Sequence, residues 1–176
     1  TDHSSYASAL SGLARLDWHT HHFEATKSYL LEADKIEKKL LLNATRHLSE
    51  RELLAYVQNF ERGLNQHFSF TQIQSGLAEV SFNDILFHKG FLLNGASKMH
   101  NLTLANPIFS SKSNELKSYH RRLAAEYTKP IDERKNVTEL EEKANALEKD
   151  LARSIAGFSE VTQQVTWQEV RQKLKP

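Results

Sequence analysis

The chain has 176 residues, of which 39% are hydrophobic and 26% are charged, and its formal net charge is +1. This near-neutral balance argues against a nucleic-acid-binding or polybasic membrane surface, because either would need an excess of Lys and Arg. No apolar run approaches the roughly 20 residues that span a bilayer, so we expect no membrane span.

The counts of Cys, Gly and Pro limit the kinds of site and the fold class that the chain can have. With no Cys, the chain has no disulfide, no thiolate nucleophile and no Cys-based zinc site. This and the lack of a recognisable signal peptide lead us to expect a cytoplasmic protein. Six Gly and three Pro provide few turns for short strands, which favours helices.

The first part of the chain is predicted to be a helical hairpin. Apolar residues recur every three or four positions over 6–19 and again over 23–41, on either side of a polar turn. Five residues occupy packing positions of a tetratricopeptide (TPR) repeat of about 34 residues: Leu10, Leu13, Ala14, Phe23 and Ala33. Asp17, His21 and Thr26 depart from the usual aromatic, Gly and Ala of that repeat, so we predict a degenerate TPR-like hairpin.

A third helix is predicted to begin at Ser49–Glu52. The Ser49 hydroxyl can accept a hydrogen bond from a backbone N–H while Glu52 reaches back, which makes a capping box. Apolar residues at spacings of three and four continue the pattern: Leu53, Val57, Phe60, Leu64 and Phe68. The polar stretch 69–75 then predicts a connection that Gly76 closes.

The most apolar stretch is 81–100, and we predict that it forms the buried central helix. Five residues make one apolar face: Phe82, Ile85, Leu86, Leu93 and Ala96. Phe87, Phe91 and Leu92 lie outside that face, and a helix that is apolar around much of its circumference has neighbours on several sides. Asn106–Pro107 is expected to end it.

The remainder predicts a loop at 110–113 and then a hairpin of long helices. The first helix has an apolar stripe that ends before Pro130: Leu116, Tyr119, Leu123 and Tyr127. The second follows a capping box at Thr138–Glu141 and has a coiled-coil-like seam: Leu140, Ala144, Leu147, Leu151 and Ile155. A capping box at Thr166–Glu169 predicts a short last helix.

One turn concentrates residues that could hold a metal: Asp17, His19, His21 and His22. Imidazole and carboxylate suit zinc, but a site needs three or four converging ligands, and a preformed helical site would use spacings of three or four. We therefore favour a solvated polar turn and predict no metal, no cofactor and no catalytic residue. A metal-binding helical protein that uses this turn is the alternative.

Other polar residues are expected to serve packing or solvation. His88, His100 and His120 fall on predicted helices, and no GxSxG, HExxH, P-loop or GxGxxG motif occurs. The basic residues around His120 lack the aromatic pattern that accompanies nucleic-acid binding: Lys117, Arg121 and Arg122.

Four phrases are distinctive as a set: LSERELLAYV at 48–57, ILFHKGFLLN at 85–94, LKSYHRRL at 116–123 and TWQEVRQKLKP at 166–176. They resemble phrases in bacterial TPR–CHAT proteins, in which TPR repeats are followed by a helical connector and a caspase-like, separase-related CHAT peptidase domain. The resemblance extends from Tyr6 to Pro176 and implies the last TPR repeat plus the connector. The family's catalytic His and Cys belong to the CHAT domain, so neither maps onto this chain.

We thus predict an all-α fold: a TPR-like hairpin at 1–46, followed at 47–176 by an antiparallel helical connector packed with it as one unit. The resemblance implies a non-catalytic scaffold within a CHAT-type cysteine peptidase. Its expected partners are proteins: the CHAT domain, the preceding TPR repeats and a target on the TPR face, with neither nucleic acid nor membrane. A stand-alone partner-binding module, acting through the concave TPR face or the stripe Leu140–Ile155, is a further alternative.

Overall fold

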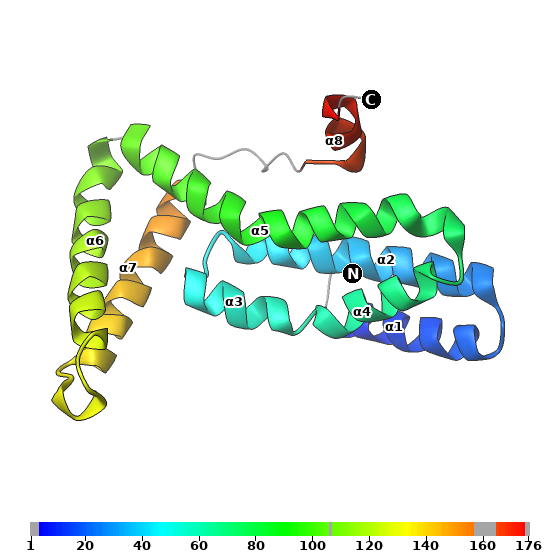
Figure 1. The fold of residues 1–176 in the computed structure, drawn as a ribbon, viewed down its shortest axis with the longest axis horizontal. Coiled ribbons are helices and arrows are strands. Elements are labelled where there is room, and N and C mark those ends of the chain that lie inside the picture. The colour runs from blue at the N-terminus through cyan, green and yellow to red at the C-terminus, as the bar shows by residue number, and fades with distance from the viewer. Residues whose placement is uncertain (1–3, 106, 157–164, 175–176) are drawn as a thin grey trace. The chain divides into compact units, whose positions relative to one another are not determined.

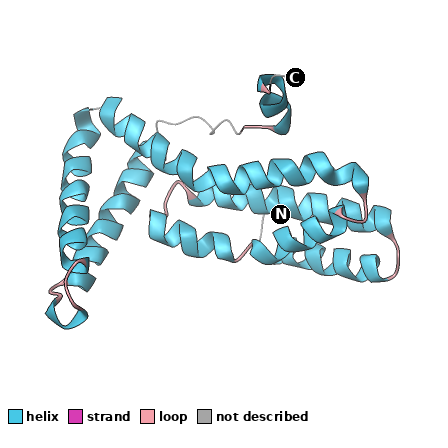
Figure 2. Ribbon diagram, in the orientation of Figure 1, coloured by secondary structure: helices cyan, strands magenta, loops and turns pink. Residues whose placement is uncertain are grey.

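The computed structural model describes residues 4–105, 107–156 and 165–174, with side chains except at 75, 92–105 and 107–108. These residues are all-α, as predicted, and contain no strand (Figure 2). The α-helices are α1 (Ser4–His19), α2 (Phe23–Ala44), α3 (Glu50–Gln58), α4 (Glu61–Thr71), α5 (Ala78–Ala105), α6 (Pro107–Tyr127), α7 (Val137–Ala156) and α8 (Trp167–Lys173) (Figure 1). Short 3₁₀ helices, η1 (Ser75–Leu77) and η2 (Ile131–Glu133), precede α5 and α7. None of the described helices is long and apolar enough to cross a membrane.

The described residues form two compact units. Unit 1 contains 4–44, 54–91 and 165–174, and unit 2 contains 45–53 and 92–156 apart from 106. The backbone therefore passes from one unit to the other within α3 and within α5, as well as after α2 and between α7 and α8. The expected organisation, a hairpin at 1–46 packed as one continuous unit with a connector at 47–176, stays a prediction.

In unit 1, α1 and α2 form the predicted hairpin. The turn between them includes His21, whose φ of 63° is in the left-handed region. Buried small residues on both helices allow their backbones to approach closely: Ala7, Ala14 and Ala33. Phe70 of α4 and Leu77 join Ala14 and Leu30 in one buried cluster, so α4 and η1 cover part of the hairpin.

The single third helix predicted from Ser49 to Phe68 is wrong, because the structure has two helices there, α3 and α4. At the break, the amides of Asn59 and Phe60 bond three residues back, to Tyr56 (3.1 Å) and Val57 (3.0 Å). The tighter turn rotates the buried face of α4, which is therefore lined by His67 and Phe70. Nothing in the sequence marks the break, because the buried Phe60 lies at it and continues the spacing of apolar residues from Val57 to Leu64.

The predicted apolar face of the central helix is also wrong in its first half. Among the α5 side chains that the structure describes, at 78–91, the buried positions are 81, 84, 87 and 91, whereas Phe82 is 38% exposed. Asp84 is fully buried on that face, among Phe87 and Phe91. Leu93 and Ala96 lie outside the side chains that the structure describes. The helix ends at Ala105, as predicted from the proline two residues later.

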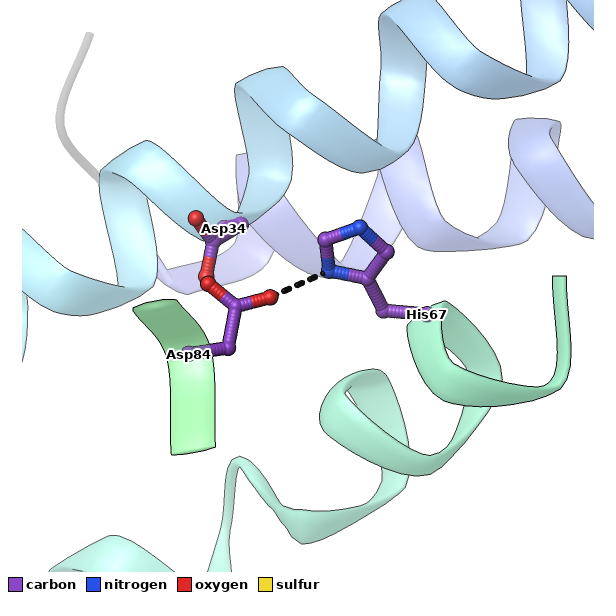
Figure 3. A group of neighbouring side chains, drawn as sticks. All are labelled: Asp34, His67 and Asp84. Atoms are coloured by element: carbon purple, nitrogen blue, oxygen red, sulfur yellow. Dashed lines mark ion pairs between the residues drawn. The ribbon is translucent and has the colours of Figure 1, made fainter. Parts of the chain in front are cut away.

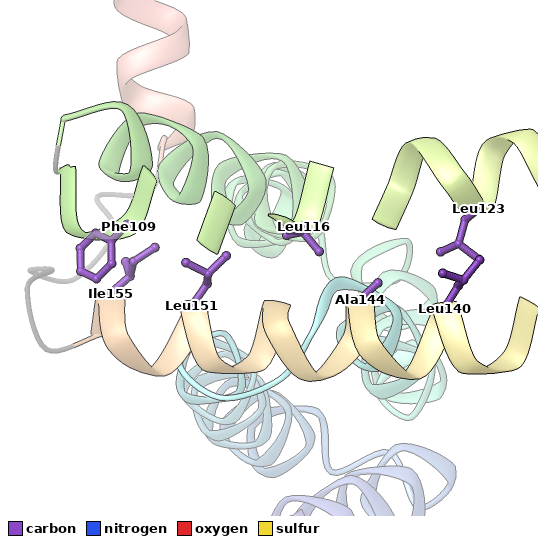
Figure 4. Close-up of a cluster of buried hydrophobic side chains, with 7 residues drawn as sticks. All are labelled: Phe109, Leu116, Leu123, Leu140, Ala144, Leu151 and Ile155. Atoms are coloured by element: carbon purple, nitrogen blue, oxygen red, sulfur yellow. The ribbon is translucent and has the colours of Figure 1, made fainter. Parts of the chain in front are cut away.

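Unit 2 is built on the antiparallel pair α6 and α7. Figure 4 shows Phe109 beside Ile155 at one end of the pair and Leu123 beside Leu140 at the other. The predicted loop at 110–113 is wrong: α6 starts at Pro107, which is well suited to the first position of a helix, and runs through 110–113. Burial of Phe109 (5% exposed) stabilises that additional turn.

The predicted capping boxes had different outcomes. Those at Ser49–Glu52 and Thr166–Glu169 are confirmed by reciprocal side-chain and backbone hydrogen bonds. At α7 the helix instead begins at Val137, so Thr138 already lies inside its first turn. The preceding Asn136 adopts a positive φ of 55°, which asparagine tolerates better than most residues.

Candidate functional site

The histidine-rich turn does not assemble a set of ligands. The closest approach to a pair is His22 Nδ1, 3.7 Å from Asp17 Oδ1 and 3.1 Å from the Thr20 hydroxyl. His21 instead packs edge-on against Phe23, with ring centroids 5.7 Å apart. His19 closes α1 as its last residue. Within the described part of the chain, the one set of three His, Asp or Glu side chains with all ligand atoms within 4.8 Å lies elsewhere, at Asp34, His67 and Asp84.

These three residues come from three helices of unit 1. Figure 3 shows the carboxylate of Asp34 on α2 next to that of Asp84 on α5, with the ring of His67 on α4 facing Asp84. Nδ1 of His67 lies 2.7 Å from Oδ2 of Asp84, and the two side chains are 3% and 0% exposed. Asp34 is less covered, with 17% of its side chain exposed. The cluster is therefore buried on the α4–α5 side and open to solvent only beside α2.

Lys38 supplies a cation to this cluster. It lies one turn after Asp34 on α2, and its Nζ is 2.7 Å from Asp34 Oδ2 while also donating to Asp84 Oδ1. Its ammonium is 5.7 Å from the centroid of the Phe87 ring, a cation–π distance. One ammonium thus bridges two carboxylates, which offsets part of the cost of burying them.

The pKa values of the carboxyls reflect burial and crowding. Burial, with the nearby Asp34, raises the pKa of Glu37 to about 7. Burial also raises the pKa of Asp34, against the opposing charge of Lys38. For Asp84 burial acts in the same direction, but contacts with His67 and Lys38 outweigh it and hold the pKa below its ordinary value.

The carboxylate of Glu37 on α2 lies against Gly63 of α4. Its carboxylate oxygens lie 3.0 and 3.1 Å from the position that a Cβ on Gly63 would take. Gly63 is one turn before His67 on the same helix, so Glu37 and His67 lie along one side of α4. The site therefore holds three carboxyls, one ammonium and one imidazole, contributed by α2, α4 and α5.

Two buried atoms of the cluster lack hydrogen-bond partners among the described residues: His67 Nε2 and Asp84 Oδ2. The Nδ1–Oδ2 approach is thus an ion-pair distance without hydrogen-bond geometry. Most buried polar atoms in proteins are satisfied, and an exception calls for an explanation such as a bound ion or water. An imidazole nitrogen and carboxylate oxygens are also the donor set of many metal sites.

The remaining predicted histidines are in structural surroundings where described. His88 is half-buried beside Phe87; burial lowers its pKa, and Asp84 partly opposes this. His120 Nε2 lies 3.1 Å from Glu148 Oε1 in unit 2. The side chain of His100 lies outside the described ones.

The basic residues near His120 also have local partners. Arg121 Nε donates to the carbonyl of Lys117 at 3.3 Å, and Arg122 lies 6.0 Å from the centroid of the Tyr119 ring. The seam Leu140–Ile155, considered as a partner surface, is buried at both ends against α6.

Sequence reasoning missed the buried cluster. Asp84 carried a usable signal, because an acid in an otherwise apolar helix is more informative than an exposed apolar residue. Asp34 and Lys38, spaced four apart, resembled any surface ion pair. No family model, curated protein or solved structure matches the chain, so the TPR–CHAT resemblance rests on the sequence phrases alone.

Proposed function

We propose that this chain is a non-catalytic helical scaffold that joins TPR repeats to a CHAT-type peptidase domain and fixes the connection between them. The sequence phrases motivate the family, and the two helical hairpins suit the role. Arrays of helical repeats are built from such hairpins, each of which packs on its neighbours along the chain.

The observation that carries the proposal is the polar attachment of α3 to α7 in unit 2. Ser49 donates to Asn145, the backbone N–H of Glu50 to Glu148 (3.1 Å), and Lys149 Nζ to Glu52 Oε1 (2.9 Å). These contacts join residues more than 90 positions apart, and Ser49 is only 1% exposed. Polar groups here hold distant segments together, which is the property a fixed connector needs.

The outer face of α1 offers a second support. Leu13 and Leu16 are 45% and 60% exposed, although Leu13 occupies a packing position of the TPR pattern. In a repeat array, the face of one hairpin is covered by the preceding one. A preceding TPR repeat would bury these two leucines.

The first test of the proposal is the sequence of the gene. The coding sequence after Pro176 is expected to encode a CHAT domain with its catalytic His and Cys. The isolated chain is expected to cleave no peptide library substrate. Peptide cleavage by the chain itself, lost on replacing a histidine such as His67 or His88, would refute the non-catalytic role.

A variant in the longer protein tests the connector. Ser49→Ala with Asn145→Ala removes the buried contact between α3 and α7, whereas Ser118→Ala removes an exposed hydroxyl on α6 as a matched control. We expect the double variant to weaken the response of peptidase activity to the TPR ligand while activity of the separately expressed CHAT domain is unaffected. An unchanged response would contradict the proposal that the attachment of α3 to α7 helps to fix the connection between the repeats and the peptidase domain.

A further inference from the structure

A buried cluster of opposite charges is expensive unless every group is paired. In the Asp34–His67–Asp84 cluster the pairing is incomplete, because His67 Nε2 and Asp84 Oδ2 have no hydrogen-bond partner among the described residues. Both belong to side chains that are at least nine-tenths buried. The unpaired Oδ2 of Asp84 faces Nδ1, the other ring nitrogen of His67, at 2.7 Å without hydrogen-bond geometry, so these two atoms are placed to act as ligands of one ion.

We propose that Asp34, His67 and Asp84 form a binding site for a divalent transition-metal ion of the Zn²⁺ class. Their ligand atoms already lie within 4.8 Å of one another, so small side-chain movements bring them to metal-bond distances near 2 Å. One imidazole and two carboxylates leave a coordination position for water, a common arrangement in zinc proteins. The three ligands come from α4, α2 and α5, so the ion would cross-link three helices of unit 1.

In this structure the ammonium group of Lys38 supplies the positive charge that a bound metal ion would supply. Its ammonium contacts both carboxylates that the ion would bind, and an ion that enters must displace it. The side chain is 21% exposed and flexible, so the ammonium can turn toward solvent without moving α2. Competition between a resident ammonium and a divalent cation predicts that removing the ammonium tightens metal binding.

The first experiment titrates the chelator-treated chain with Zn²⁺ alone and follows heat and thermal unfolding. One equivalent is expected to bind and to raise the melting temperature. Lys38→Gln is expected to bind at least about tenfold tighter, which corresponds to about 1.4 kcal/mol of relieved competition. His67→Gln is expected to bind at least about tenfold more weakly, because it removes a ligand. Co²⁺ in place of Zn²⁺ should show the absorption bands of a nitrogen–oxygen site in wild type and lose them in His67→Gln.

The histidine-rich turn provides the matched control. A His19→Ala/His21→Ala/His22→Ala variant removes three exposed imidazoles of unit 1 and should leave the stoichiometric binding intact. If His67→Gln does not fold, judged by its far-UV circular dichroism, Asp34→Asn tests the same site at a partly exposed position. The proposal is overturned if neither wild type nor Lys38→Gln binds one equivalent, if binding disappears with the turn histidines, or if Lys38→Gln does not tighten it.

Discussion

Replacing Glu37 by Gln is expected to stabilise the protein in alkaline but not in acidic solution. The folded protein holds the pKa of Glu37 at about 7, against an ordinary value of 4.5. Between these values the folded state keeps a proton that the unfolded chain releases, so stability falls as the pH rises through this range. Full conversion of the pKa difference would give about 3 kcal/mol. Because the carboxyl is partly exposed and solvent screens it, we expect about 1–2 kcal/mol.

Urea unfolding of wild type and Glu37→Gln between pH 4.5 and 9, with chelator present, measures this difference. The groups of the cluster that face Glu37 are Asp34 on its own helix, His67 on α4 and Asp84 on α5, and all three remain in both proteins. Glu24→Gln, an exposed change on α2, is the control and should give no gain in stability over wild type at pH 8. Equal stabilities of Glu37→Gln and wild type at both pH 5 and pH 8 would refute the reasoning.

Three further predictions concern packing and capping. Leu151→Ala removes a fully buried side chain from the α6–α7 cluster and should cost about 3–4 kcal/mol in urea unfolding, against a smaller loss for the partly buried Leu147→Ala. Ser49→Ala removes the cap of α3 and should cost about 1–2 kcal/mol, and a loss below that of Ser118→Ala would contradict the buried contact. Trp167→Ala removes the ring pair with Phe82, at 4.7 Å, and should speed amide exchange in 165–174 up to about tenfold; unchanged exchange would show that α8 does not depend on it.

The helices themselves were largely predictable because local rules determine them. Apolar residues at spacings of three and four correctly predicted α1, α2, α6 and α7, and the capping box at Ser49 correctly predicted the start of α3. The prediction of a loop at 110–113 was wrong because four consecutive polar residues are typical of a loop. The sequence does not show that the neighbouring Phe109 is buried and holds this segment in α6. The break at Asn59 was missed since apolar spacing continues through it.

The candidate site was not predictable, for a physical reason. Histidines and acids attract attention when they are adjacent in sequence, as at Asp17–His22, yet ligands converge through packing of distant helices. Asp34, His67 and Asp84 are separated by 33 and 17 positions, and only the rotation of the buried faces of α4 and α5 brings them together. That rotation follows from the break before α4 and from burial of Asp84, neither of which the apolar pattern indicated.

The repeated passage of the backbone between the units affects how this protein can be dissected. Segment 45–53 belongs to unit 2 but lies between two segments of unit 1, and segment 165–174 belongs to unit 1 but follows a long segment of unit 2. A single cut anywhere from 54 to 156 therefore leaves each fragment with residues of both units. Neither unit can therefore be excised as one continuous segment. A chain nicked by protease in the connection between α4 and η1 should stay associated in native buffer, and its two pieces should complement each other when mixed after separate refolding.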